Sequence, residues 1–343
     1  MSDKMKAAAY VGGDKLEIMD MPIPKIVNDD DVLLKVKVAG ICGSDLNFLA
    51  SKGFGREYKE PRIIGHEYIG EILEIGKKVN YLKAGDLVTI SNNISCGFCD
   101  YCRMGIKDMC TNMRSIGYGE NGGFAEYSVA PAEALFSLPK GLSIESGALA
   151  EPLSCVVNAM SKVRFEPADS IVVLGGGPIG QLYVRLVKFT GACKVILSEP
   201  SPYRAELGIK SGADKVINPI DSDIEKEVKS EMKLGADLVI DAVGTLFGTA
   251  LKLVRARGTI LLFGSARDSG GEGIISQKDI MRREITIRGS FISSYTFPIV
   301  LRLLEQNALR VEELISHKLK LSQLNEGIEL LRKVQANKIM IYP

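Results

Sequence analysis

Four of the seven cysteines in the chain fall within fifteen residues. They are spaced C-x2-C-x2-C-x7-C in a segment rich in Gly, Asn and Asp, as Cys96, Cys99, Cys102 and Cys110. One short loop can bring four such thiolates to the corners of a tetrahedron, the geometry that zinc takes in structural sites. Because this shell leaves no open position, we expect the zinc to stabilise the loop and not to bind substrate. Four unrelated buried cysteines and an iron–sulfur cluster are the alternatives; clustered thiols disfavour the first, and nothing else in the sequence points to electron transfer.

A second set of potential metal ligands is dispersed along the sequence. It comprises Cys42, His66, Glu67 and Glu151, in the turn-like segments GICGSD, IIGHEYIG and LAEPLS. Three protein ligands from separate segments leave a fourth position on zinc for water or a substrate oxygen, whose pKa the metal lowers towards neutral. The alternative is a packed thiol and a hydrogen-bonded core histidine. The chain has two histidines, His66 and His317, so any histidine-dependent chemistry uses one of them.

A glycine-rich turn follows an apolar run. Residues 170–174 predict a buried strand, and residues 179–190 have helical spacing. The turn between them contains Gly175, Gly177, Pro178, Ile179 and Gly180. In this context the pattern G-x-G-x-x-G is typical of a dinucleotide site, because its glycines make the turn, admit a pyrophosphate and let helix and strand pack closely. The alternative is a glycine turn with a structural role alone.

A carboxylate follows the next predicted strand. Glu199 lies nineteen residues beyond Gly180. A carboxylate there accepts a hydrogen bond from the ribose 2′-hydroxyl of NAD and repels the 2′-phosphate of NADP, so we expect NAD to be preferred. Arg204 argues the other way, since a nearby guanidinium can receive that phosphate, but we expect Arg204 to be a solvated helix residue.

The elements that position these residues divide the chain into two domains of the α/β class. Residues 1–155 read as short β segments, such as 31–39 and 85–90, and predict a mostly-β catalytic domain that binds zinc. Residues 156–291 alternate strands with helices, which predicts a doubly wound parallel sheet that binds the dinucleotide. Its strands are expected at residues 170–174, 194–198, 215–217, 236–241, 259–263 and 284–291. Residues from about 292 to 343 are expected to rejoin the first domain.

Composition excludes several classes of function. Forty-three basic side chains against forty-two acidic ones leave a net charge of +1, which gives no field to attract nucleic acid or an anionic membrane. The most apolar stretch, residues 171–187, carries a glycine cluster, Gln181 and Arg185, so no membrane span is expected. The polar start has no secretory signal pattern, and clustered thiols suit a reducing compartment. We therefore expect a cytoplasmic protein whose partner is a small molecule.

Several segments resemble the medium-chain zinc-dependent alcohol dehydrogenases, and the resemblance covers essentially the whole chain. They are CGSD at 42–45, GHE at 65–67, the four-cysteine loop and GGFAEY at 122–127. EPLS at 151–154 is similar to the polyol dehydrogenase branch, in which glutamate replaces a cysteine ligand. The resemblance implies a GroES-like catalytic domain, a Rossmann nucleotide domain and two zincs per chain, the catalytic one bound by Cys42, His66 and a glutamate. Glu67 and Glu151 are both candidates for that glutamate, and their exchange during turnover is a hypothesis.

The implied reaction is hydride transfer from a secondary alcohol to NAD, which yields a ketone. Ser44 occupies the position where the family uses a Ser or Thr hydroxyl as first proton relay; an ordinary turn serine is the alternative. Asn47 stands where many relatives carry a histidine, so the onward path of the proton is open. Ile292 and Ser293 replace the Arg-Tyr pair of animal sorbitol dehydrogenases, which argues against sorbitol. Another polyol, a sugar alcohol, its phosphate or a vicinal diol fits, as does a hydroxy amino acid in the manner of threonine dehydrogenases.

The resemblance also implies a homodimer or homotetramer formed through the edge of the nucleotide domain's sheet. Two other classes compete with a zinc-dependent enzyme. A non-catalytic zinc-loop protein that binds nucleic acid is disfavoured by the neutral charge and by the lack of a basic, aromatic face. A relative of the quinone reductases without zinc ligands is disfavoured because the dispersed ligand set is retained.

Overall fold

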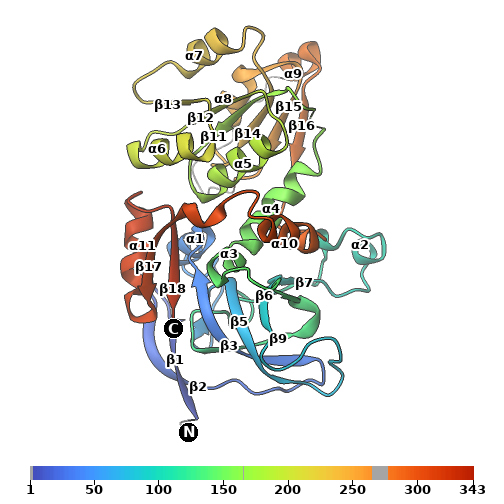
Figure 1. Ribbon diagram of the computed structural model, residues 1–343, viewed down its shortest axis with the longest axis vertical. Coiled ribbons are helices and arrows are strands. Elements are labelled where there is room, and N and C mark those ends of the chain that lie inside the picture. Colours follow the sequence, from blue (N-terminus) through green and yellow to red (C-terminus); the bar gives the residue numbers. More distant parts are fainter. Residues whose placement is uncertain (1–2, 165, 265–276) are drawn as a thin grey trace. The chain divides into compact units, whose positions relative to one another are not determined.

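The computed structural model describes residues 3–164, 166–264 and 277–343, and the chain divides into two compact units (Figure 1). Unit 1 comprises Met1–Ser154 and Ser293–Pro343, and unit 2 comprises Cys155–Ile292. The predicted fold class is confirmed, because unit 1 is mostly β and unit 2 is built on a parallel sheet with helices. None of the helices in the described ranges combines the length and the apolar composition needed to cross a membrane.

The sheet of unit 2 has the strand order β13-β12-β11-β14-β15-β16 among the described residues. The strands are β11 (Ser170–Leu174), β12 (Lys194–Ser198), β13 (Lys215–Ile217), β14 (Ala236–Asp241), β15 (Val254–Leu262) and β16 (Thr286–Gly289). The central strands are apolar runs buried on both faces, as expected of a parallel sheet covered by helices. The strand order reverses between β11 and β14, so the loop after β11 lies at the point where such sheets bind ligands.

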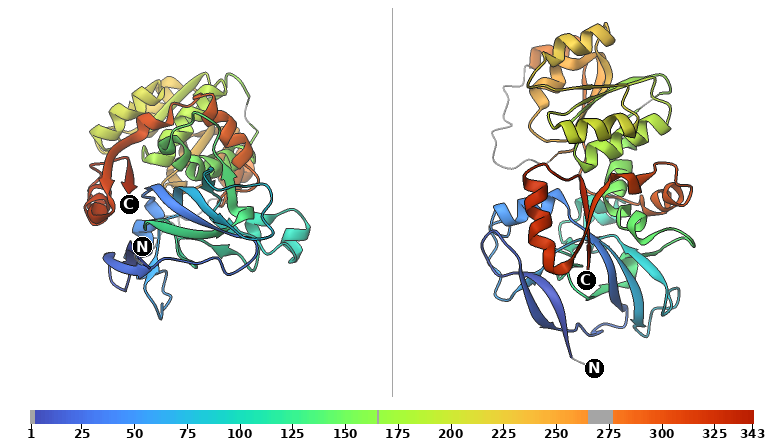
Figure 2. Two further views of the ribbon diagram at one scale, coloured as in Figure 1. Left: turned by 60° about the horizontal axis from the view of Figure 1, so that its bottom comes forward. Right: turned by 60° about the vertical axis from the view of Figure 1, so that its left-hand side comes forward.

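Helices lie on both faces of this sheet (Figures 1 and 2). They are α5 (Pro178–Phe189), α6 (Pro202–Ser211), α7 (Ile224–Glu231), α8 (Phe247–Leu253) and α9 (Gln277–Arg283). α5 packs beside α6, and α7 beside α8. α5 begins with Pro178 in its first turn, where the missing N–H costs no helical hydrogen bond. The strand expected at 259–263 begins earlier, at Val254, and the strand expected at 284–291 is shorter.

Unit 1 is organised around β3, which pairs with β5, β9 and β18. The larger sheet has the order β10-β6-β5-β3-β18-β17, and the smaller ones are β2-β1-β4 and β7-β8. Its strands are β1 (Lys4–Tyr10), β2 (Glu17–Pro22), β3 (Asp31–Gly40), β4 (Arg62–Ile63), β5 (Glu67–Ile75), β6 (Leu87–Ile90), β7 (Asn93–Ile94), β8 (Arg114–Ser115), β9 (Tyr127–Pro131), β10 (Leu135–Ser137), β17 (Ile315–Lys320) and β18 (Lys338–Tyr342). The last strand of the sequence therefore lies beside one of the first, as the red and blue arrows in Figure 2 show.

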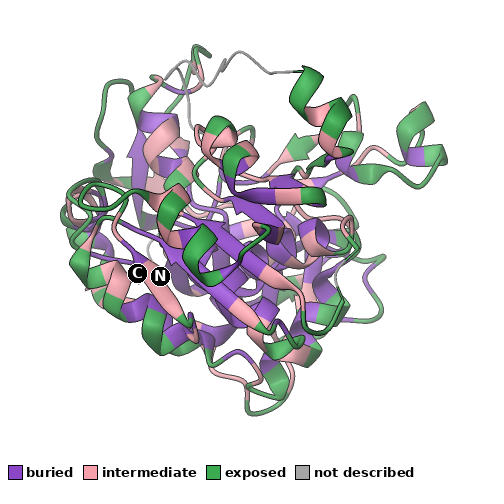
Figure 3. Ribbon diagram, turned by 90° about the horizontal axis from the view of Figure 1, so that it is seen from above, coloured by how far each residue is buried: buried purple, intermediate pink, exposed green. Residues whose placement is uncertain are grey.

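Short helices complete unit 1: α1 (Gly43–Ala50), α2 (Asp100–Arg103), α3 (Ile144–Ala148), α10 (Phe297–Glu305) and α11 (Leu324–Arg332). α4 (Ala150–Met160) begins in unit 1 and ends in unit 2. Most strand residues are buried, and most exposed residues lie on helices and loops (Figure 3), but the edge strands β2 and β16 are largely exposed. In β3 the apolar side chains at Val32, Leu34, Val36 and Val38 are all buried, so one face of this strand enters the core of unit 1.

Candidate active site

Three of the dispersed candidate ligands lie together at one end of the β3–β5 pair. β3 ends at Gly40, which pairs with Glu67, the first residue of β5. Cys42 then caps the N-terminus of α1, and His66 directly precedes β5. One donor atom from each of Cys42, His66 and Glu67 lies within 4.8 Å of the others. The antiparallel register thus brings together side chains that the sequence separates widely.

Asp45 supports two of these residues. Its Oδ2 accepts a hydrogen bond from the backbone N–H of Cys42 at 2.9 Å, and its Oδ1 lies 3.4 Å from Nδ1 of His66. The carboxylate is fully buried. Burial alone would lower the pKa of His66, but Asp45 and Cys42 raise it well above its ordinary value. Burial, with the charge of Glu67, raises the pKa of the Cys42 thiol.

Glu67 forms a buried ion pair with Lys338, from β18. The two side chains are 1% and 2% exposed, and Lys338 also donates to the carbonyl of Ile41 at 3.2 Å. Burial alone would lower the pKa of Lys338, but the attraction of Glu67 and Cys42 raises it. Gly40 leaves room for the pair, because a Cβ at this position would lie 2.5 Å from Oε2 of Glu67.

The donor atoms fit a zinc ion. Oε1 of Glu67 is buried without a hydrogen-bond partner within the described residues. A thiolate, an imidazole and a carboxylate are all ligand types that zinc takes. Nδ1 of His66 faces Asp45, and Nε2 lies 3.5 Å from the Ser44 hydroxyl. A carboxylate behind one ring nitrogen commonly orients the other nitrogen towards a metal.

Glu151 occupies a different place from the one expected. It lies in the first turn of helix α4 and not in an irregular turn, because Pro152 is tolerated where a helix begins. It is buried, but within the described residues it does not belong to the group of Cys42, His66 and Glu67 whose donor atoms could hold a metal ion. Its charge nevertheless raises the pKa values of Lys338 and Tyr118.

The Ser44 hydroxyl lies against the same cluster. It donates to Sγ of Cys42 at 3.0 Å and accepts a hydrogen bond from the phenol of Tyr118 at 2.7 Å. The ring of Tyr118 contacts that of His66, with centroids 5.0 Å apart. Burial raises the pKa of Tyr118 well above its ordinary value, and Asp45 adds to the effect.

Sequence reasoning missed Asp45, Tyr118 and Lys338. Asp45 carried a signal, because an acidic residue three positions after a helix cap commonly bonds back to the cap, as it does to Cys42. The signal for Lys338 was weaker: it is a lysine that directly precedes the apolar run IMI. The position of Tyr118 depends on tertiary packing, and no local sequence pattern predicts it.

The four clustered cysteines form a separate group in the loop that contains α2, which projects from the rest of unit 1 in Figure 1. Their sulfur atoms lie within 4.8 Å of one another, and all four are free thiols. Backbone N–H groups donate to Sγ of Cys96 and of Cys110, at 3.4 and 3.2 Å. Backbone hydrogen bonds lower the pKa of Cys99 to about 6, and burial raises that of Cys102 to about 11. Four converging sulfurs fit a structural zinc.

In unit 2 the glycine turn has the geometry of a phosphate-binding loop. Gly175 adopts a φ of 95°, which favours glycine. A Cβ on Gly180 would lie 1.8 Å from the carbonyl oxygen of Gly175, so strand and helix approach too closely for a side chain. At Gly177 the nearest atom to such a Cβ is Nη1 of Arg204 at 3.8 Å, which leaves the backbone open to a ligand at the N-terminus of α5. This cradle fits a dinucleotide pyrophosphate.

Glu199 and Arg204 both face this turn. Glu199 directly follows β12, and its carboxylate accepts hydrogen bonds from the backbone N–H groups of Gly176 at 2.7 Å and Ser201 at 2.8 Å. Each carboxylate oxygen keeps a further lone pair for a ligand hydroxyl. The expectation that Arg204 is a solvated helix residue is wrong, because its guanidinium lies beside Gly177 and burial lowers its pKa.

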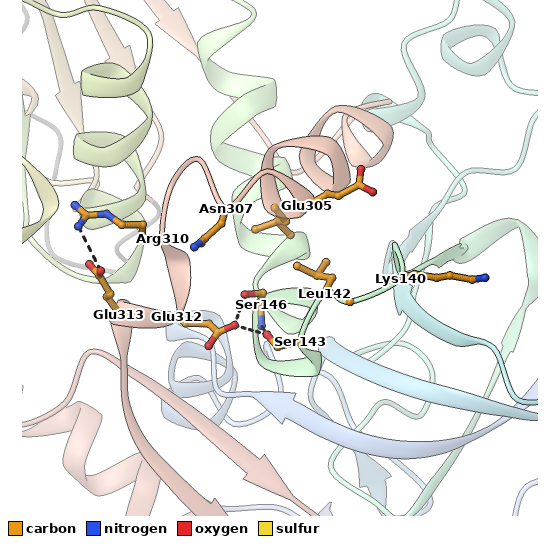
Figure 4. A pocket seen from close by; sticks show the side chains of 11 residues that line it. Lys140, Leu142, Ser143, Ser146, Glu305, Asn307, Arg310, Glu312 and Glu313 are labelled. Atoms are coloured by element: carbon orange, nitrogen blue, oxygen red, sulfur yellow. Dashed lines mark hydrogen bonds and ion pairs between the residues drawn. The ribbon is translucent and has the colours of Figure 1, made fainter.

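A cavity of about 420 Å³ in unit 1 shares no residue with these groups (Figure 4). At its wall Glu312 accepts hydrogen bonds from the hydroxyls of Ser143 and, at 2.8 Å, Ser146. Glu313 pairs with Arg310 at 3.5 Å. The Glu312 contacts join the C-terminal segment of unit 1 to α3, which gives them a structural role.

Comparison with known proteins gives matches to both units. Residues 28–140 match the alcohol dehydrogenase GroES-like domain, and residues 178–306 match the zinc-binding dehydrogenase family. The chain is 33% identical to D-arabitol-phosphate dehydrogenase of Enterococcus avium, over 99% of this chain and 98% of that protein. It is 34% identical to L-threonine 3-dehydrogenase of Caldanaerobacter subterraneus, over 95% of each. A solved zinc-binding dehydrogenase of Sinorhizobium meliloti bound to NADP superposes with a TM-score of 0.92 at 30% identity, over 100% of both chains.

Proposed function

Because the chain belongs to the zinc-binding dehydrogenase family and is therefore an enzyme, we propose that it oxidises a secondary alcohol to a ketone and transfers the hydride to NAD. The observation that carries this proposal is the convergence of Cys42, His66 and Glu67, with the Ser44 hydroxyl beside them. A metal-binding trio next to a hydroxyl suits the removal of a proton from an alcohol.

We assign the catalytic zinc to Cys42, His66 and Glu67. Zinc bound there would supply positive charge that lowers the pKa of the substrate hydroxyl. Asp45 faces Nδ1 of His66 at 3.4 Å, and Ser44 is the candidate first proton relay, which would take the substrate's proton while passing its own proton to water. Glu151 is a candidate second carboxylate that exchanges with Glu67 during turnover.

The second zinc is assigned to Cys96, Cys99, Cys102 and Cys110, which gives two zincs per chain. Metal analysis tests both assignments, since Cys42→Ser and Cys99→Ser should each remove about one zinc per chain. A wild-type content near one zinc would contradict the catalytic assignment.

We propose NAD as the preferred nucleotide on the basis of Glu199. A carboxylate next to the glycine turn repels a 2′-phosphate, although Arg204 partly offsets its charge. The relative that binds NADP makes this a point to test. We expect kcat/KM to be higher with NAD than with NADP. Glu199→Ala should reduce the ratio of kcat/KM with NAD to kcat/KM with NADP. A wild-type preference for NADP would refute the role of Glu199.

The substrate class we propose is a polyol, sugar alcohol, sugar alcohol phosphate or vicinal diol. The match to a D-arabitol-phosphate dehydrogenase supports it. Oxidation of a hydroxy amino acid is the second candidate, favoured by the match to an L-threonine 3-dehydrogenase. Ile292 and Ser293, next to the boundary between the units, argue against sorbitol.

An NAD reduction screen at alkaline pH decides between these substrates. It compares polyols, their phosphates, vicinal diols and L-threonine, with simple secondary alcohols as the reference and Cys42→Ser as the inactive control. We expect the highest kcat/KM with a polyol, its phosphate or a diol. A preference for L-threonine would select the second candidate, and no reduction with any of them would refute the proposed function.

We further propose a homodimer or homotetramer and a cytoplasmic location. β16 is an edge strand whose four residues are all exposed, which supports pairing with the same strand of a second copy. The clustered free thiols support a reducing compartment. A monomer in gel filtration would refute the proposed oligomer. Recovery of the protein outside the cytoplasmic fraction would refute the proposed location.

A further inference from the structure

The contact between Tyr118 and Ser44 has no part in the function proposed so far. We propose that Tyr118 is a positioning residue that fixes the Ser44 hydroxyl so that its remaining lone pair accepts a hydrogen bond from the hydroxyl of the substrate alcohol and orients it. This inference rests on the proposed function. It concerns a residue that acts through Ser44 and not one that reacts itself.

The hydrogen bonds of Ser44 set the direction of its lone pairs. A serine hydroxyl has one proton and two lone pairs, and by itself it rotates freely. Here the proton points to Sγ of Cys42 at 3.0 Å, and the Tyr118 phenol donates into one lone pair at 2.7 Å. The second lone pair is then fixed in direction and available to a substrate hydroxyl. Without Tyr118 the same hydroxyl could rotate away from that direction.

The phenol of Tyr118 is itself held in place by packing. Its ring contacts Phe48 and Phe54, with centroids 5.7 and 5.3 Å away, and His66 at 5.0 Å. Phe48 is fully buried, and Tyr58 donates to the backbone carbonyl of Tyr118 at 3.4 Å. An aromatic ring packed on three sides loses little further freedom when its hydroxyl forms a hydrogen bond. This pre-organisation is what a positioning role requires.

A purely structural role for Tyr118 makes a different prediction. Phenylalanine at this position keeps the ring contacts with Phe48, Phe54 and His66 and removes the hydroxyl alone. If packing is the sole contribution, Tyr118→Phe leaves kcat unchanged. If Tyr118 orients Ser44, the substitution lowers kcat and has little effect on the KM of the alcohol.

A double-mutant cycle on the zinc-loaded enzyme separates the two roles. We expect Tyr118→Phe to lower kcat about tenfold, as the loss of one hydrogen bond acting in the transition state would, and to change KM less than about twofold. In the Ser44→Ala background the same substitution should change kcat less than about twofold. Tyr10→Phe is the matched control, because Tyr10 packs on Phe48 in the same aromatic cluster, with centroids 5.0 Å apart, and its substitution leaves the Tyr118–Ser44 hydrogen bond in place, so kcat should stay within about twofold.

A spectroscopic measurement tests the contact independently of turnover. Tyrosine labelled at Cζ with a stable carbon isotope gives one signal per residue, and the Tyr118 signal is assigned by its loss in Tyr118→Phe. In Ser44→Ala the Tyr118 signal should shift and the Tyr58 signal should not. An unmoved Tyr118 signal, or equal effects of Tyr118→Phe in both backgrounds, would overturn the inference. A wild type that oxidises no alcohol would refute the proposed function instead, while a shifted signal would still show the contact without a catalytic role.

Discussion

The ion pair of Lys338 and Glu67 gives the sharpest test of how the site is built. Lys338→Met keeps most of the side chain's length but removes its charge, which leaves the Glu67 carboxylate buried without a cation. Breaking a buried pair costs about 3–5 kcal/mol, and the lost hydrogen bond to Ile41 adds about 1 kcal/mol. With a urea m-value of about 3 kcal/mol/M, the unfolding midpoint should fall by about 1–2 M.

Urea unfolding followed by tyrosine fluorescence measures this loss, since the chain contains no tryptophan. Lys318→Met is the matched control, because Lys318 pairs with Glu145 while its own side chain is 58% exposed, so its loss should cost less than about 1 kcal/mol. The double variant Lys338→Met with Glu67→Gln should recover most of the stability, because no unpaired charge is left.

The same urea measurement can be made with and without zinc. The cost of Lys338→Met should be largest in chelator-treated protein and smaller with zinc bound, because the ion supplies the positive charge that Glu67 has lost. Equal midpoints for the Lys338 and Lys318 variants, in chelator-treated protein, would refute the reasoning.

Three further predictions concern protons, turnover and folding. Burial raises the pKa of the Cys42 thiol, and Asp45 and Cys42 outweigh burial in raising that of His66, so zinc must displace protons from these ligands and its affinity should rise with pH. Calorimetry in buffers of different ionisation enthalpy that finds no more proton release than in a variant lacking both side chains would contradict this. Ser44→Ala should lower kcat about a hundredfold or more, and an unchanged pH-rate profile would remove Ser44 from the relay. Glu312→Ala should cost about 1–3 kcal/mol of unfolding free energy with kcat unchanged, and an unaltered urea midpoint would show that its contacts with Ser143 and Ser146 contribute nothing.

The parts of the structure that the sequence predicts are those determined by residues close together in the sequence. The strand at Ser170–Leu174 and the glycine turn after it are local signals, and both were located to the residue or nearly so. The four cysteines likewise lie in one loop whose spacing already implies their convergence.

The remaining parts depend on contacts between distant segments. The segment LAEPLS is expected to be a turn, but Glu151 lies in the first turn of α4, where the missing N–H of Pro152 costs no helical hydrogen bond. Arg204 is expected in solvent from the sequence, whereas helix α6 turns it towards the glycine loop, a contact between segments that the sequence of α6 does not indicate. Lys338 and Tyr118 reach the site from other strands and loops, and no periodicity in their own segments indicates this.

The position of β18 also bears on how the protein is made. Cys42, His66 and Glu67 are synthesised early, but Lys338 belongs to a strand that follows all of unit 2 in the sequence. A growing chain emerges from the ribosome in order, so the earliest-made part of unit 1 must wait with an unneutralised carboxylate while unit 2 is translated and can fold. Unit 2 is thus free to fold during synthesis, and the cluster of Cys42, His66 and Glu67 gains its contact with Lys338 only after β18 has emerged.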